Sequence, residues 1–136
     1  MGAIPHVEMS FAGRAVEQLR RWPALTLCRA ESGAGRGLAL STRQIVHLHG
    51  TNEAELYLTA PVIERMRQVL LESGRVRLDP GGGWVRVSLD SDSDVRLLVS
   101  LVSVAIKANV TNAGKAHRRV TPCPRVRVAS KVRFEA

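Results

Sequence analysis

The sequence predicts an α+β protein, with a mostly antiparallel sheet of about six strands packed by three helices. Two observations support this prediction. Several short segments alternate apolar and polar residues, which is typical of strands covered on one face. Three longer segments repeat apolar residues at intervals of three and four, as amphipathic helices do. The order along the chain is helix, four strands, helix, two strands, helix, which favours helices packed against one face of a sheet.

Each expected helix has a start or stop signal. Ser10 is placed to cap the first helix, and Pro23 to stop it. Pro61 starts the second helix, and Gly74 is placed to terminate it. The apolar face expected of this helix consists of Val62, Ile63, Met66, Val69 and Leu70. The run Ser-Asp-Ser at 91–93 offers caps and acidic groups that favour the N-terminus of the third helix. The expected helices span residues 10–22, 61–73 and 94–110.

The third helix is apolar almost all round, with a single narrow polar stripe. A helix with so wide an apolar face must be covered on more than one side. It is either the central core helix of a monomer, which is the favoured interpretation, or a dimer interface through residues 94–110. The polar stripe consists of Arg96, Ser100, Ser103 and Lys107.

The expected strands are short and are joined by turn sequences. A glycine-rich connection at 31–36 lies between two strands, so it predicts a hairpin and not the strand-to-helix loop of a phosphate site. The run at 79–83 predicts a turn. The expected strands span residues 25–30, 37–41, 45–49, 53–58, 75–78 and 84–89.

Length and charge divide the chain into a body and a tail. A chain of 136 residues is one ordinary domain, assigned to residues 1–110. The net charge is +8, but most of it lies in residues 111–136, a basic tail expected to be disordered or to form one edge strand. A basic tail predicts only non-specific attraction to polyanions such as nucleic acid. The residues expected to provide it include Lys115, Arg118, Arg119, Arg125 and Arg127.

The sequence also indicates a compartment. No apolar run approaches the roughly 18 to 20 residues of a membrane span. The N-terminus lacks the basic and apolar regions of a signal peptide. Cys28 and Cys123 fit no zinc or redox spacing. We therefore expect a cytoplasmic protein with reduced cysteines and no membrane partner.

The most informative segment is a predicted hairpin that carries two histidines. His47 and His49 are two residues apart, so both imidazoles point to one face of the strand, opposite to Val46 and Leu48. If the turn keeps the apolar faces together, Glu55 of the next strand joins the histidines. Such a group can perform acid–base chemistry or contribute metal ligands. The favoured alternative is a polar outer face of the sheet without a function.

Two further observations limit the candidate site. Two histidines leave a zinc site short of ligands, so no metal site is assigned, and no cofactor follows from the sequence. Trp84 follows the 79–83 turn, where it can pack in the core, cover the end of the sheet or line a pocket; core packing is favoured.

The motifs of this region resemble a known family. His47-Leu48-His49-Gly50, Glu55 to Leu58, Gly83-Trp84-Val85 and the acidic-capped last helix resemble the small bacterial and fungal proteins labelled "luciferase domain". The resemblance covers roughly residues 10–108, and its label implies light-emitting oxidation. Family members commonly carry a further histidine shortly before Gly-Trp-Val, where this chain has Arg-Val-Arg-Leu-Asp at 75–79. The resemblance therefore implies a shared surface limited to His47, His49 and Trp84.

Three hypotheses of function follow. The first is a binding or interaction module that uses His47, His49, Glu55 and Trp84. The second is a small enzyme, an oxidoreductase by the family label alone, with His47 as the acid–base group; it predicts a concave, partly apolar pocket around these residues. The third is polyanion binding by the tail, with a steep salt dependence that disappears when residues 111–136 are removed.

Overall fold

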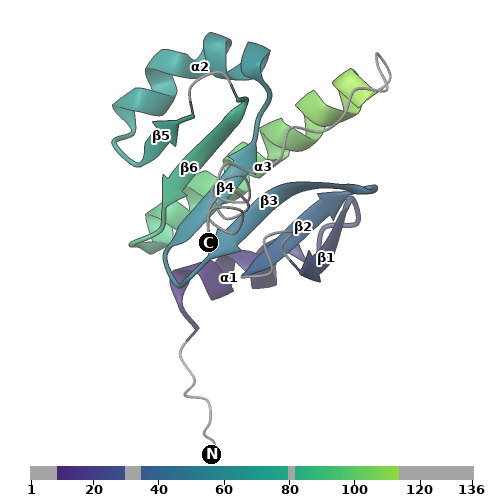
Figure 1. Ribbon diagram of the computed structural model, residues 1–136. Helices are drawn as coiled ribbons and strands as arrows, with labels where there is room; N and C mark the ends of the chain where they lie inside the picture. Colours follow the sequence, from purple (N-terminus) through teal and green to yellow (C-terminus); the bar gives the residue numbers. More distant parts are fainter. Residues whose placement is uncertain (1–8, 30–34, 80–81, 114–136) are drawn as a thin grey trace, which may run out of the picture.

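A six-stranded antiparallel sheet forms the centre of the computed structural model, which describes residues 9–29, 35–79 and 82–113 (Figure 1). The order of the strands across the sheet is β1-β2-β3-β4-β6-β5. The predicted fold class and element order are confirmed. The strands are β1 (Leu25–Arg29), β2 (Arg36–Leu40), β3 (Arg43–His49), β4 (Glu53–Tyr57), β5 (Val76–Leu78) and β6 (Trp84–Ser88).

Three helices accompany the sheet: α1 (Phe11–Leu19), α2 (Ala60–Glu72) and α3 (Asp92–Ala113). Figure 1 shows α3 running diagonally behind the sheet, with α1 below it and α2 above, beside β5. The α1 and α3 helices contact each other, and α3 contacts the central strands β4 and β6. Ser10 caps α1 as predicted, because its Oγ accepts a hydrogen bond from the Gly13 N–H at 3.0 Å. The α1 helix ends before the predicted residue 22.

The hydrophobic core lies between the sheet and the α1–α3 layer. Alternate residues of the strands face the helices, and the most buried residues of α3 face the sheet. The polar stripe predicted on α3 is exposed. This packing gives α3 the central position favoured from the sequence, while dimerisation through it stays a prediction. The core includes Val46, Leu48, Leu56, Val85, Val87, Leu98 and Val102.

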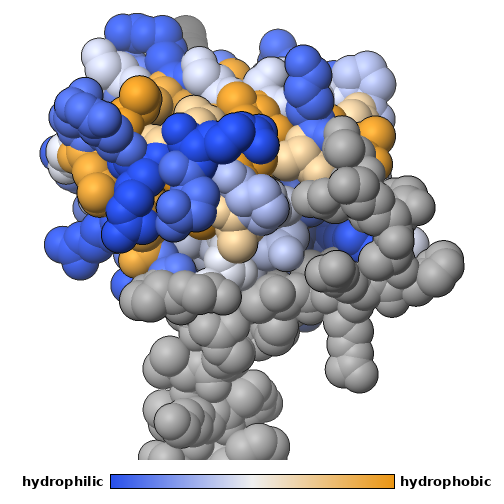
Figure 2. Space-filling model, turned by 90° about the horizontal axis from the view of Figure 1, so that it is seen from above, coloured by the Kyte–Doolittle hydropathy of each residue, from blue (hydrophilic) through white to orange (hydrophobic). Residues whose placement is uncertain are grey.

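The α2 helix packs less completely than the sequence suggests. Val62, Ile63 and Leu70 are buried, as expected of its apolar face. Val69, which was expected on the same face, is 64% exposed, so that part of the prediction is wrong. The reason is that α2 lies at the end of the sheet and mainly contacts β5. Figure 2, which looks down on this end, shows hydrophilic and hydrophobic side chains intermixed at the surface.

The acidic start of α3 forms an ion-pair cluster. The Asp94 N–H donates to the Ser91 Oγ at 3.2 Å, so Ser91 acts as a cap. The Asp94 carboxylate accepts from the Asp90 N–H at 2.8 Å and from Arg75 at 2.9 and 3.1 Å. Burial opposes ionisation of Asp94, but these hydrogen bonds outweigh it and lower the pKa of the carboxyl group below its ordinary value. The capping interpretation of this acidic segment is confirmed.

Several sequence predictions concern residues outside the described ranges. These are residues 114–136 of the predicted 111–136 tail, which include Cys123, and parts of the 31–36 hairpin and the 79–83 turn. Residues 111–113 continue α3, so the helix runs past the predicted boundary at residue 110. Within the described ranges, no helix has the length and apolar character needed to cross a membrane.

The junction between β4 and α2 holds a strained residue. Thr59 has φ 81° and ψ 150°, a combination that a β-branched residue rarely adopts. The N–H groups of Leu58 and Thr59 both donate to the Gly83 carbonyl, at 2.9 and 3.0 Å. Asn109 of α3 donates to the Tyr57 carbonyl at 3.0 Å, which holds the same junction from the other side. The surrounding hydrogen bonds therefore maintain a backbone conformation that threonine disfavours.

We predict that Thr59→Gly stabilises the protein. Glycine adopts positive φ without steric strain, and the Thr59 Oγ1 is buried without a hydrogen-bond partner among the described residues. The free energy of unfolding in urea is expected to rise by about 1 kcal/mol. Thr51→Gly, in an exposed turn without positive φ, is the control and should leave stability unchanged or lower it. A loss of stability in Thr59→Gly would contradict the assignment of strain.

Candidate functional site

One row of side chains crosses the sheet on the face opposite the hydrophobic core. Its neighbours are directly opposed in the strand register, so they point to the same side. His47 opposes Glu55, and Glu55 opposes Arg86. The complete row, from β1 to β5, is Cys28, Gly37, His47, Glu55, Arg86 and Arg77.

The structure brings the predicted site residues together but buries them. His47 and His49 share one face of β3, as predicted, with ring centroids 5.9 Å apart. The expectation of a polar outer face wetted by solvent is wrong: His47 and Glu55 have no exposed surface, and His49 is 6% exposed. Alternation reveals which residues share a face, but it does not reveal whether that face is covered.

The Glu55 carboxylate is held from both neighbouring strands. Its Oε1 lies 2.7 Å from the Nε2 of His49 on β3. Its Oε2 accepts a hydrogen bond from the Arg86 Nε on β6 at 3.0 Å. The Arg86 side chain remains 38% exposed, so it connects the buried carboxylate with solvent. Burying a carboxylate without partners is costly, and these two contacts offset that cost.

The other histidine is fixed by an amide. The Gln44 Nε2 donates to the Arg29 carbonyl at 2.9 Å, which determines the orientation of the amide. The Gln44 Oε1 therefore faces the His47 Nε2, at 2.7 Å, and can only accept. His47 must carry its proton on Nε2, which leaves a lone pair on Nδ1. That Nδ1 is buried and has no hydrogen-bond partner among the described residues.

A β-bulge places Gln44 beside His47. Leu38 of β2 pairs with Val46, but the next residue, Ala39, pairs with Gln44, so Ile45 is the extra residue on β3. Ile45 and Val46 are both buried in the core despite being consecutive. The bulge thus moves Gln44 onto the face that His47 occupies.

Gly37, directly opposite His47, is necessary for this arrangement. A Cβ atom at this position would lie 2.6 Å from the Gln44 Oε1 and 3.3 Å from the Cδ2 of His47. Only a residue without a side chain leaves room for the amide–imidazole contact as it stands.

Aromatic rings cover the His47 imidazole. Trp84 stacks on it, with ring centroids 5.4 Å apart and an interplanar angle of 15°. The Tyr57 ring in turn packs against Trp84, with ring centroids 5.3 Å apart. Trp84 is completely buried, as the favoured interpretation required, but it packs against the polar row and is not part of the core on the helix side.

Burial determines the protonation of His47. Desolvation, assisted by repulsion from His49 and opposed by attraction to Glu55, lowers the pKa of His47 from 6.5 to about 4. The ring is therefore neutral near pH 7, in agreement with the tautomer that Gln44 imposes. A neutral imidazole with a lone pair on Nδ1 can accept a hydrogen bond, take up a proton or bind a metal ion.

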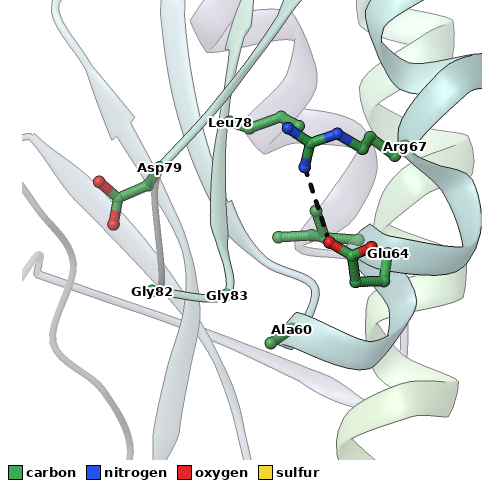
Figure 3. Close-up of a pocket in the computed structure, with 8 residues that line it drawn as sticks. Ala60, Glu64, Arg67, Leu78, Asp79, Gly82 and Gly83 are labelled. Atoms are coloured by element: carbon green, nitrogen blue, oxygen red, sulfur yellow. Dashed lines mark ion pairs between the residues drawn. The ribbon is translucent and has the colours of Figure 1, made fainter.

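The structure also contains hollows beside the site. One, of about 230 Å³, is lined by Arg77, Leu78, Asp79 and Arg86, so it meets the polar row at the guanidinium that holds Glu55. A second hollow of about 230 Å³ lies between α2 and the β5–β6 connection. In Figure 3, the Asp79 carboxylate points away from the Glu64–Arg67 ion pair on α2. Neither hollow is lined by His47, His49 or Trp84.

The comparison with protein families supports the resemblance found in the motifs. Residues 42–105 match the family model described as the luciferase domain. The matched segment contains Gln44, both histidines, Glu55 and Trp84, and it ends before the basic tail. No curated protein and no solved structure matches the chain significantly.

Sequence reasoning missed two residues of the site. Arg86 alternates with core residues on β6 and shares a face with Trp84, a signal that could have placed it beside Glu55. Gln44 carried no such signal, because simple alternation places it on the face of Val46 and only the bulge reverses it.

The protonation of His47 predicts a pH-dependent stability. Between pH 6.5 and pH 4 the unfolded chain binds a proton at His47 that the folded protein excludes. Stability should therefore fall as the pH drops through this window, by up to roughly 3 kcal/mol, and this contribution should level off below pH 4. Urea unfolding at a series of pH values measures it. His47→Phe removes the titrating group, so an equally steep decline in that variant would refute the assignment.

Proposed function

We propose that this protein is a binding module whose ligand site is formed by His47, His49, Glu55 and Trp84. The single observation that carries the proposal is the His47 Nδ1, a buried acceptor without a partner among the described residues. Leaving such an atom unsatisfied costs about 1–3 kcal/mol. A ligand that provides a donor or a positive charge at this atom recovers that free energy.

The geometry around His47 supports this proposal because it is preorganised. Gln44 fixes the tautomer, Trp84 fixes the plane of the ring, and Glu55 with Arg86 supplies fixed charge beside it. A ligand would meet groups that need not reorient, which reduces the free-energy cost of binding. The agreement of residues 42–105 with the luciferase-domain family is compatible with this function but does not identify the ligand.

The two histidines should respond differently to substitution. His47→Phe keeps the stacking on Trp84 and removes the unsatisfied nitrogen while losing the bond to Gln44, so stability at pH 7 should change by no more than about 1 kcal/mol. His49→Phe removes a partner of the buried Glu55 carboxylate and should destabilise by about 3 kcal/mol or more. Chemical denaturation measures both. A large loss in His47→Phe would mean that His47 serves the fold and not a ligand.

Binding itself can be tested with small probes. Phenol and acetamide each offer a hydrogen-bond donor, and titration of either into isotope-labelled protein is expected to shift the His47 imidazole and Trp84 indole resonances. The stable His47→Phe variant should lose the shift of the Trp84 resonance. Shifts that persist unchanged in His47→Phe would place binding elsewhere and contradict the proposal.

A second candidate is an enzyme in which His47 Nδ1 accepts a proton from a small anionic substrate. The hollow lined by Arg77 and Arg86, which His47 does not line, favours a small anionic substrate, because the two arginines are directly opposed in the strand register and Arg86 also holds Glu55. The side chains of His47, His49 and Glu55 can transfer protons or coordinate a metal ion. The oxidoreductase activity that the family label implies is part of this candidate.

Anion binding in the hollow tests this candidate. Inorganic phosphate should shift the Arg77 and Arg86 resonances, and Arg77→Gln should weaken its binding roughly tenfold or more, since one charge-assisted hydrogen bond is lost. Arg20→Gln, an exposed change at the C-cap of α1, is the control for net charge. Equal weakening by both variants would indicate non-specific attraction and remove the evidence for a substrate hollow.

A further inference from the structure

Three potential metal ligands converge on the face of the sheet that carries the polar row. One ligand atom from each of His47, His49 and Glu55 lies within 4.8 Å of the other two, and all three residues are buried. Ligands that share one ion at about 2.0–2.2 Å each lie up to roughly 4 Å apart, so small side-chain movements would close the set. The sequence already grouped Glu55 with the two histidines, and the register of β3 and β4 places Glu55 directly opposite His47.

The surrounding contacts have the form that supports a metal ion. A ligating histidine commonly donates its second ring N–H to a fixed acceptor, which orients the ring. Gln44 does this for His47, because it accepts from Nε2 and leaves Nδ1 as the coordinating atom. Arg86 bonds to Oε2 of Glu55, so the carboxylate is oriented through one oxygen while the other faces His49. The buried Nδ1 without a partner is thus accounted for as a ligand atom.

The ligand atoms favour some metal ions over others. Two imidazole nitrogens and one carboxylate oxygen suit divalent first-row transition metals, whereas Ca²⁺ and Mg²⁺ prefer sites made of oxygen atoms. Three protein ligands also leave coordination positions for water or another molecule. Binding requires that the proton now between His49 and Glu55 leave the His49 Nε2, and that the 2.7 Å separation of these atoms increase to about 3.0–3.4 Å.

We propose that His47, His49 and Glu55 bind one divalent first-row transition-metal ion, with His47 coordinating through Nδ1. This inference rests on the proposed binding function and names the class of its ligand. Gln44 is a positioning residue, since it acts on the metal only through His47.

The metal-free full-length protein is titrated with Co²⁺, and binding is measured by visible absorption. A second titration with Zn²⁺ is measured by calorimetry. One ion should bind per chain, and the thermal midpoint should rise with metal concentration. His47→Phe and Glu55→Gln should each lower the affinity more than about 100-fold, beyond the 10- to 100-fold expected for Gln44→Leu. Glu64→Gln, an exposed carboxylate change on α2, is the control and should bind as the native protein does.

His47→Phe tests the inference even if Glu55→Gln does not fold, because it leaves the contacts of Glu55 with His49 and Arg86 intact. Unchanged metal affinity in His47→Phe, or a thiolate-to-cobalt charge-transfer band, would place the ion elsewhere and overturn the inference. Absence of binding to the native protein would also overturn it. Phenol and acetamide titrations of the same samples separate the two proposals. If the small probes bind and the metal does not, the binding module stands and the metal site is refuted. If neither the probes nor the metal bind, both proposals are refuted.

Discussion

The buried carboxylate of Glu55 is the constraint on which the sheet depends. A charge without solvent contact in the middle of a sheet is tolerated only where opposite charge and hydrogen-bond donors reach it. Those groups come from both neighbours of β4, with His49 on β3 and Arg86 on β6. A slip of one residue in either pairing would turn the partner to the opposite face. Charge therefore reinforces the register that the apolar face already favours.

The two histidines illustrate how neighbouring side chains divide structural and chemical roles. His49 forms a hydrogen bond with Glu55 and is bound to the fold through it. His47 is oriented by the Gln44 amide, which the Arg29 carbonyl holds in place, and by the Trp84 indole. In that orientation its Nδ1, a strong acceptor, has no hydrogen-bond partner among the described residues. Natural structures maintain such a buried acceptor at a free-energy cost, which is typical of sites that serve a ligand.

Much of this arrangement follows from sequence patterns, and the exceptions have physical causes. Alternation correctly placed His47, His49 and Glu55 on one face, because β3 and β4 pair in register beyond the bulge. It could not find Gln44, since the extra residue in β3 reverses the face. It also could not show that the face is covered, because burial depends on chain segments distant in sequence. Val69 was misplaced for a similar reason, as α2 has only the end of the sheet to pack against.

The absence of a side chain at Gly37 has a consequence beyond close packing. A single methyl group there would collide with the oxygen of the Gln44 amide and push it out of line with the imidazole. If the amide turned to present its nitrogen, the proton of the ring would move to Nδ1 and the site would offer a donor where it now offers a lone pair. The lone pair that His47 presents thus depends on one missing carbon atom on the adjacent strand as well as on the Arg29 carbonyl that orients the Gln44 amide.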